Sequence, residues 1–408
     1  MTHYGRSPWL DRFPKSRIPS YPRFRGRVDS AVVVVGGGLT GCATAYAFAA
    51  AGIDVILLEA DRVGRGTTAS ASGWIAEDPG TSFLALEKAT GLRSARRAWQ
   101  GWRRAALDAA ALLRRLDVKC DLEPQSSLTI ASTPDELVRL KRELKARRDA
   151  GIDAPFLNAR AVSAEIALPS GGGLRGRDGA TLDPYRACLG LASAARERGA
   201  QFFERSPVTR INFGRRSVDV RTAAGAIRAS HVVVATGIPT TLFAPLQRHF
   251  WFRSAYHALT GRLPAKVRQQ LGRQSTVVRD SAEPSHMIRW VDGERLLVTG
   301  ADRESPPSRQ RDKITIQRTG QLMYELSTLY PDISGILPDY GWDAAYARTS
   351  DGLPYFGPHR NFPRHLFAFG DSSHSVTGSY LASRILLRHY LGEVEPADEP
   401  FAFTRNVR

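Results

Sequence analysis

The sequence contains only three cysteines in 408 residues, and it has no long hydrophobic run. The spacing of Cys42, Cys120 and Cys188 matches neither a metal site nor a disulfide framework, so we expect no bound metal and a reducing compartment. No apolar run approaches the ~18 residues of a membrane-spanning helix, and the N-terminal residues lack the apolar core of a signal peptide. These absences argue against a secreted disulfide-rich domain and against a membrane span, and they predict a cytoplasmic protein.

Lysine is also scarce, because seven lysines stand beside 50 arginines in a chain of formal net charge +17. A nucleic-acid-binding surface gathers its positive charge in one patch that is interleaved with aromatic side chains. Here the arginines are scattered, and their densest groups fall on expected helices at 93–104 and 139–148. We interpret these groups as solvated helix faces and expect no nucleic-acid partner. Attraction of acidic partners or substrates is the alternative.

A nucleotide-binding pattern occupies residues 31–59. The apolar, β-branched run 31–35 fits a strand that is covered on both faces. It leads into a G-x-G-x-x-G sequence formed by Gly36, Gly38 and Gly41. The first glycine permits a tight turn, the second lets the backbone approach a pyrophosphate, and the third lets the next helix lie against the strand. Because strand, turn and helix agree, a dinucleotide site is favoured over a turn that binds no phosphate.

An acidic residue completes this pattern. A second apolar strand, 55–58, ends at Glu59, close to the ~20-residue offset at which an acid binds the ribose hydroxyls. An acid at this place favours an unphosphorylated ribose, and therefore FAD or NAD over NADP. The helix that begins near Leu39 and Thr40 presents free N–H groups and a positive dipole end to the phosphates.

Two flanking segments also carry information. The loop 64–73 (GRGTTASASG) leads into Trp74 and Ile75, and its small and hydroxylated residues suit contacts with a pyrophosphate and a flavin ring. A flexible loop is the alternative. Residues 1–28 contain four prolines together with several large apolar residues, so we expect an extended arm that lies on the globule. A partner-binding arm is the alternative there.

Helical and strand patterns alternate along the rest of the chain. Helices are expected at 82–116, 133–150, 183–199, 314–329 and 377–391, and residues 133–136 have the form of a capping box with proline at the first helical position. Strands are expected from residue 202 onward, including a buried one at 231–237, and the pattern over 250–340 is typical of an antiparallel sheet. The length favours two domains or one interleaved pair.

Beyond residue 28, most of the sequence resembles the FAD-dependent oxidoreductases of the D-amino-acid oxidase group, which includes glycine and sarcosine oxidases. The resemblance rests on VVVVGGGLTG with Glu59, the GTTAS loop, SPV at 206–208, VVVATG at 232–237, DGLP at 351–354 and FAFG…VTG at 367–378. It implies an α/β fold in which a Rossmann-like FAD-binding domain is interleaved with an antiparallel-sheet substrate domain. The FAD-binding domain would comprise 29–85, 160–245 and 345–395, the substrate domain 86–159 and 246–344, with an arm at 1–28 and a tail at 396–408.

The resemblance also implies FAD contacts. Glu59 would hold the adenosine ribose, Val208 would contact adenine, and the last helix would aim its N-terminus at the flavin N1–C2=O edge, where reduction places negative charge. No cysteine follows Cys188 and no histidine replaces Ser72 or Trp74, so FAD is expected to be non-covalent. The expected contacts are Gly36, Gly38, Leu39, Thr40, Gly41, Glu59, Ala60, Gly66, Thr67, Thr68, Ser72, Gly73, Trp74, Val208, Ala235, Thr236, Gly237, Gly370, Asp371, Ser375, Val376 and Thr377.

Candidate substrate residues follow from the same resemblance. Arg289 matches a carboxylate-binding arginine, Tyr256 matches an aromatic position near the substrate, and His374 stands in the turn beside the flavin. Each has a structural alternative, namely a surface position for Arg289, packing in the sheet for Tyr256 and packing over the turn for His374. Arg348 falls where relatives often carry an acid, which would favour a more anionic substrate.

The implied activity is oxidation of the CH–NH bond of a small amine or amino acid by hydride transfer to flavin N5, followed by hydrolysis of the imine. The electron acceptor is O2 or another acceptor, since beyond residue 145 the chain has only Lys266 and Lys313 as candidates for an oxygen-activating lysine. Two alternatives remain: oxidation of a hydroxy acid, and a basic, non-catalytic flavoprotein that serves as a binding module. The oligomeric state is not indicated by the sequence.

Overall fold

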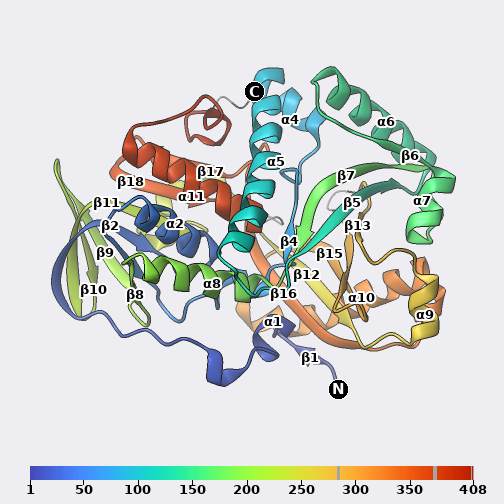
Figure 1. Ribbon diagram of the computed structural model, residues 1–408, viewed down its shortest axis with the longest axis horizontal. Helices are drawn as coiled ribbons and strands as arrows, with labels where there is room; N and C mark the ends of the chain where they lie inside the picture. The colour runs from blue at the N-terminus through green and yellow to red at the C-terminus, as the bar shows by residue number, and fades with distance from the viewer. Residues whose placement is uncertain (283–284, 371–374, 406, 408) are drawn as a thin grey trace.

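The computed structural model describes residues 1–282, 285–370, 375–405 and 407. Two sheets lie side by side in Figure 1, the smaller on the left and the larger on the right. Helices α2 (Leu39–Ala50), α8 (Pro184–Glu197) and α11 (Ser375–Leu391) lie over the smaller sheet, and α10 (Arg311–Leu329) packs against the larger one. The predicted α/β class, with a Rossmann-like sheet beside a mainly antiparallel sheet, is confirmed.

The smaller sheet has eight strands among the described residues and contains the nucleotide-binding sequence. Its main path is β17-β18-β11-β2-β3-β8, in which every pair from β18 to β8 is parallel. Strands β9 and β10 add an antiparallel extension to β11. The bounds are β2 Gly26–Val35, β3 Val55–Leu58, β8 Gln201–Phe203, β9 Val208–Phe213, β10 Val218–Thr222, β11 Gly225–Gly237, β17 Tyr355–His359 and β18 Phe362–Phe369.

Four successive valines explain why β2 lies at the centre of this sheet. Val32 and Val34 belong to a hydrophobic cluster that includes the helices α2 and α8. Val33 and Val35 belong to a second cluster on the opposite face, which includes residues of β10. A strand that is buried on both faces has a continuous apolar sequence rather than an alternating one, and this is why the sequence alone indicated its place.

The larger sheet has ten strands among the described residues, in the order β1-β16-β12-β15-β14-β13-β5-β7-β4, with β6 paired to β7. Only the pairs β1–β16 and β13–β5 are parallel. The bounds are β1 His3–Tyr4, β4 Trp74–Ile75, β5 Glu123–Ala131, β6 Phe156–Asn158, β7 Gly172–Thr181, β12 Trp251–Thr260, β13 Thr276–Arg279, β14 Met287–Val291, β15 Arg295–Glu304 and β16 Pro338–Arg348.

The expected helices are present. The segment 82–116 forms two helices that are separated at Gly91, whose φ is +84°. The capping box is confirmed, since Thr133 and Glu136 exchange both of its hydrogen bonds at the start of α6. The other helices are α1 Pro8–Asp11, α3 Thr67–Ser70, α4 Phe83–Thr90, α5 Leu92–Arg115, α6 Pro134–Asp149, α7 Ala159–Ile166 and α9 Ala265–Gln270. In the described part of the chain, no helix has the length and apolar character needed to cross a bilayer.

Two strands connect the predicted domains in an unexpected way. The family resemblance places β4 and β7 in the FAD-binding domain, yet both strands pair within the larger sheet. β4 follows directly on the loop 64–73, so this loop connects the smaller sheet to the larger one. The domain boundaries themselves stay a prediction.

The first 28 residues lie against the globule in short elements. β1 pairs with β16, the short helix α1 carries buried Trp9, and Tyr21 and Phe24 are also buried. The indole N–H of Trp9 donates to the carbonyl of Ala71 at 2.9 Å. The N-terminal segment therefore contacts the loop 64–73 from the outside.

A buried ion pair fixes the DGLP segment from the other end of the chain. The Asp351 side chain is 0% exposed, and Arg405 donates Nε to its Oδ2 at 2.7 Å and Nη2 to its Oδ1 at 2.8 Å. The same guanidinium donates to the carbonyl groups of Leu353 and Pro354. Removal of one member of such a pair leaves an uncompensated buried charge.

Arg405→Ala is expected to lower the free energy of unfolding by about 3–5 kcal/mol, because Asp351 then stays buried without its partner. Equilibrium denaturation in urea measures this loss. The matched control is Arg104→Ala, which breaks an exposed pair with Asp108 and is expected to leave the midpoint unchanged. Equal midpoints for both variants would contradict a stabilising role for the Arg405–Asp351 pair.

Candidate active site

The glycine-rich turn joins β2 to α2 in the predicted strand–turn–helix order. Gly36 has a φ of +107°, and a Cβ on it would lie 2.7 Å from the carbonyl oxygen of Ala235. A Cβ on Gly41 would lie 1.9 Å from the carbonyl oxygen of Gly36. These contacts exclude any side chain at both positions, so the packing of strand, turn and helix requires glycine here.

Glu59 lies beside this turn at the carboxyl end of β3. Its Oε2 accepts the N–H of Gly37 at 2.6 Å and its Oε1 accepts the N–H of Asp61 at 2.8 Å. The side chain is half-buried, so the carboxylate is accessible at the edge where the turn ends. A carboxylate in this position suits the hydroxyl groups of a ribose whose diphosphate lies on the turn.

Five other expected contacts lie at the same edge, because the carboxyl ends of parallel strands meet there: Ala60, Ala235, Thr236, Gly237 and Gly370. Val208 instead begins β9 in the antiparallel extension. The carbonyl of Ala235 lies against Gly36, and the N–H of Gly370 donates to the carbonyl of Gly237 at 3.1 Å. Thr236 and Val208 are half-buried, and Ala60 is exposed directly after Glu59. The edge therefore brings together segments that are far apart in the sequence.

The loop that follows is held by its backbone. In the last four residues of this loop, 70–73, each backbone carbonyl group accepts a hydrogen bond from a different segment of the chain. The donors, in that order, are the indole Nε1 of Trp342 at 3.0 Å, the indole Nε1 of Trp9 at 2.9 Å, the guanidinium Nε of Arg289 at 2.8 Å and the backbone N–H of Leu182 at 2.8 Å. This loop is therefore positioned by the larger sheet, the N-terminal segment and the start of α8 together.

The loop also meets the glycine-rich turn. Oγ1 of Thr68 accepts the N–H of Leu39 at 2.8 Å, so the first turns of α2 and α3 face each other. A Cβ on Gly38 would lie 3.1 Å from the same hydroxyl oxygen. Thr67 and Gly66 are exposed beside Thr68. The cradle of N–H groups without side chains, with a hydroxyl and the Glu59 carboxylate at its borders, fits the diphosphate and ribose of FAD.

The N-terminus of α11 approaches the segment directly after β4. Thr377 donates its hydroxyl to the carbonyl of Ala76 at 2.8 Å, and Val376 is buried next to it. The hydroxyl groups of Thr40 in α2 and Ser379 in α11 share a hydrogen bond of 2.8 Å. Ser375 begins α11, whereas Asp371 and His374 lie outside the described residues.

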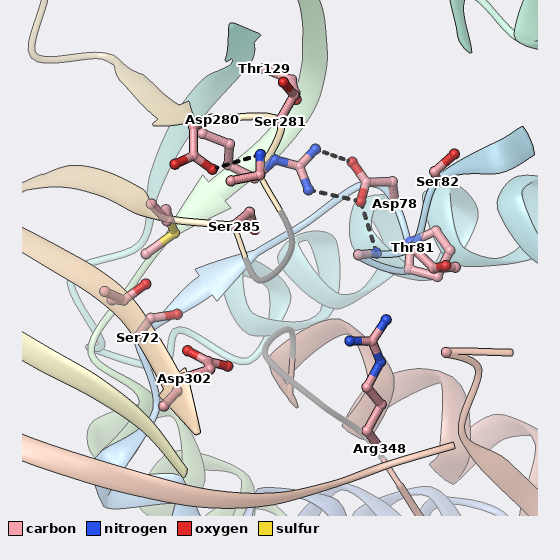
Figure 2. A pocket seen from close by; sticks show the side chains of 18 of the residues that line it. Ser72, Asp78, Thr81, Ser82, Thr129, Asp280, Ser281, Ser285, Asp302 and Arg348 are labelled. Atoms are coloured by element: carbon pink, nitrogen blue, oxygen red, sulfur yellow. Dashed lines mark hydrogen bonds and ion pairs between the residues drawn. The ribbon is translucent and has the colours of Figure 1, made fainter. Parts of the chain in front are cut away.

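A cavity of about 650 Å³ opens between this loop and the larger sheet. Thr67, Ala71 and Ser72 form part of its wall from the loop, and strands β12, β14, β15 and β16 contribute the opposite side. Ser72, Asp302 and Arg348 all line the cavity, and Figure 2 shows the first two at the lower left and Arg348 at the lower right. A space of this size beside the expected flavin loop can hold a small substrate.

Two ionic groups of the cavity wall are satisfied by each other. Arg279 donates Nη1 to Oδ1 of Asp78 at 3.1 Å and Nη2 to Oδ2 at 2.6 Å, as the dashed lines in Figure 2 show. The guanidinium also lies 5.0 Å from the ring centre of Trp74. This pair connects β13 to the segment after β4 and stabilises the wall.

Arg289 is buried beneath the loop and is not among the residues that line the cavity. Besides the carbonyl of Ser72, it donates to the carbonyl groups of Trp290 and Leu182 at 3.2 and 3.4 Å. Burial lowers the pKa of Arg289 to about 10, so it stays charged at neutral pH. The geometry therefore favours a structural role for Arg289, in which it holds the loop in place. It gives less support to the predicted contact with a substrate carboxylate.

Tyr256 lies on the face of β12 that points away from the cavity. It is fully buried in the cluster formed with α10, whereas its neighbours Ala255 and His257 line the cavity. Successive side chains of a strand point to opposite faces, so a one-residue difference decides the environment. The geometry favours the alternative in which Tyr256 packs in the sheet.

Three residues that line the cavity were not predicted from the sequence, namely His257, Asp302 and Tyr346. The His257 ring stacks on Trp342 with a centroid distance of 5.0 Å, and Tyr346 donates its hydroxyl to Asp302 at 2.5 Å. The residue types alone do not mark these positions. They depend on which face of the sheet each strand residue occupies.

Gly38→Ala is expected to weaken FAD binding at least tenfold, or about 1.4 kcal/mol, because the new methyl group lies in the approach to the diphosphate. Titration of the FAD-free protein with FAD, followed by flavin fluorescence, measures the dissociation constant. Gly320→Ala is the control, since a Cβ there meets nothing within 4 Å. An unchanged dissociation constant in Gly38→Ala would remove the turn from the cofactor site.

Burial lowers the pKa of His257 to about 3, with Arg289 adding to the shift, so the folded protein keeps this ring neutral. Unfolded His takes up a proton below pH ~6.5, so stability is complete above that pH and is lost as the pH falls toward 3. We expect the unfolding free energy of the wild type to fall by up to ~1.4 kcal/mol per pH unit more than that of His257→Phe. Urea denaturation at pH 7, 6 and 5 tests this, and parallel curves would contradict it.

Comparison with known proteins identifies the family. The family model described as FAD dependent oxidoreductase matches residues 31–388. Gamma-glutamylputrescine oxidoreductase of Escherichia coli (strain K12) is 27% identical over 371 residues, which cover 90% of this chain and 85% of that protein. Glycine oxidase of Bacillus licheniformis is 26% identical over 379 residues, covering 89% and 94%.

Solved structures show the same fold. Glycine oxidase from Geobacillus kaustophilus superimposes with a TM-score of 0.74 at 21% identity, covering 93% of this chain and 100% of that one. L-Amino acid deaminase from Proteus myxofaciens gives a TM-score of 0.76 at 15% identity, covering 99% of each chain. Since the family model spans most of the sequence and its glycine-rich turn, this chain belongs to the FAD-dependent oxidoreductase family and is an enzyme that holds FAD non-covalently.

Proposed function

We propose that this enzyme oxidises the CH–NH bond of a small amine or amino acid. FAD, when bound, would supply the two-electron acceptor for the hydride on the carbon that carries the nitrogen, after that nitrogen has lost its ammonium proton to water. The resulting imine reacts with water to give a carbonyl compound and ammonia or a smaller amine. The final electron acceptor is O2 or another oxidant, and within the described residues no lysine lines the cavity.

The cavity of about 650 Å³ carries this proposal. It adjoins the loop that is expected to contact the flavin, and its wall presents both a carboxylate, Asp302, and a guanidinium, Arg348. A wall with both charges suits a substrate that has a cationic nitrogen and an anionic group. The relatives support this class, because glycine oxidases and a gamma-glutamylputrescine oxidoreductase are among them.

The chain's own residues would hold and orient the reactants. The diphosphate would lie on residues 36–41, the ribose on Glu59, and the flavin ring against residues 66–75 and the start of α11. A helix N-terminus at Val376 and Thr377 would stabilise negative charge on the reduced ring. The three buried, unpaired cysteines support a reducing, cytoplasmic location.

Anaerobic mixing of the purified holoenzyme with panels of amines, amino acids and hydroxy acids tests the proposal. We expect the flavin absorbance to bleach with members of the first two panels and, on turnover of primary amines with an acceptor, one ammonia per oxidised substrate. Bleaching by hydroxy acids alone, without ammonia release, would assign the enzyme to alcohol oxidation instead. Re-oxidation by O2 separates an oxidase from a dehydrogenase.

A further inference from the structure

Four carboxylates line the cavity, and three of them are committed to other groups of the protein. Asp78 is paired with Arg279. Glu143 accepts from two backbone N–H groups, a serine and an arginine, and Asp280 accepts from His286 and two backbone N–H groups. The fourth, Asp302, has a single hydrogen-bond donor to its carboxylate in the described part of the chain, the neutral hydroxyl of Tyr346.

A bulge in β15 turns Asp302 toward the cavity. The pairing of β12 with β15 shifts between Ser254 and Tyr256, which face Arg303 and Gly300 respectively. One extra residue is therefore present in β15 at this point, and Ala301 adopts a φ of +53°, a conformation that residues with a side chain rarely take. With regular alternation from Thr299, which lines the cavity, Asp302 would point to the opposite face.

Strained backbone of this kind is found where a side chain has to be aimed at a functional site. Here its effect is to place a carboxylate on the wall of the cavity that Ser72 also lines, and Ser72 belongs to the loop expected to contact the flavin (Figure 2). Tyr346 donates to Oδ2 at 2.5 Å and thereby fixes the orientation of the carboxylate. The other oxygen, Oδ1, accepts no hydrogen bond from the described residues and is available to a ligand.

We propose that Asp302, oriented by Tyr346, binds the cationic nitrogen of the substrate and selects amines over alcohols. The inference rests on the proposed amine oxidation and names the residue that recognises the amine. An ammonium group offers charge-assisted hydrogen bonds to a carboxylate, and a hydroxyl group does not. Arg348 lies two residues beyond Tyr346 on the same face of β16, about 7 Å along the strand, which suits the carboxylate of a small amino acid.

The charged surroundings of Asp302 predict a pH dependence. Burial raises the pKa of its carboxyl, while Tyr346, Arg253, His286 and Arg348 lower it. The carboxylate binds the amine only when it is ionised, so the apparent dissociation constant of the amine rises as the pH falls through the pKa of Asp302. His286 also titrates, because Asp280 raises its pKa, and Glu325 lies on its other side. A variant without the carboxylate separates the two groups.

The test compares Asp302→Asn, Tyr346→Phe and the wild type as holoenzymes in anaerobic flavin reduction, with an amino acid that reduces the wild type. Asp302→Asn is expected to raise the dissociation constant of this substrate at least 30-fold. It is also expected to abolish the acidic limb of the pH profile, that is, the rise of this dissociation constant as the pH falls. Acetate, a carboxylate without nitrogen, is expected to perturb the flavin spectrum of both proteins with dissociation constants within twofold. Asp332→Asn removes an equal charge at an exposed site and serves as the matched control.

Tyr346→Phe gives a readout that a merely structural role would not move. The tyrosine hydroxyl lowers the pKa of Asp302. Loss of the hydroxyl is therefore expected to shift the acidic limb of the dissociation-constant profile to higher pH without abolishing it. An unchanged dissociation constant in Asp302→Asn, or an equal loss of acetate and amine binding, would overturn the assignment. If no amine reduces the wild type, the proposed function fails first; if amines reduce wild type and Asp302→Asn alike, this inference fails alone.

Discussion

The backbone of residues 70–73 is the constraint on which the site depends. Its four carbonyl groups accept hydrogen bonds from β16, the N-terminal segment, β14 and Leu182, which lies between β7 and α8. Two of these donors are buried indoles and one is a buried guanidinium, so a shift of the loop would leave buried polar groups without partners. The loop therefore sets the distance between the nucleotide-binding edge of the smaller sheet and the cavity of the larger one.

Two unusual backbone conformations place chemical groups on either side of this loop. In the smaller sheet, Gly36 and Gly41 leave no room for side chains, so only backbone would face a diphosphate that lies on this turn. In the larger sheet, the bulge at Ala301 directs Asp302 into the cavity. In the proposed account, the first conformation would hold the cofactor and the second would contact the substrate, so that the protein orients the reactants while the flavin supplies the chemistry.

The part of the fold that local physics determines could be read from the sequence. The glycine-rich turn and the buried strand β2 follow from steric needs and apolar runs, and the capping box at Thr133 depends on four adjacent residues. Features that depend on strand register could not be read. The resemblance predicts Tyr256 near the substrate, whereas the structure places its neighbour His257 on the cavity wall. Asp302 carries no signal in the sequence because its direction depends on a bulge. The resemblance marks Arg289 as a functional candidate. Its contact with the loop carbonyl group of Ser72, however, depends on the three-dimensional fold.

The central claim is that the cofactor's diphosphate lies on residues 36–41 while its flavin ring lies between the loop at 70–73 and the cavity. A crystal structure of the yellow holoenzyme is the most direct test. We expect density for one FAD per chain, with the ribose on Glu59 and the reactive face of the ring open toward Ser72 and Asp302. A chain that crystallises without FAD in the presence of excess cofactor, or a flavin ring that lies away from this loop, would contradict the account.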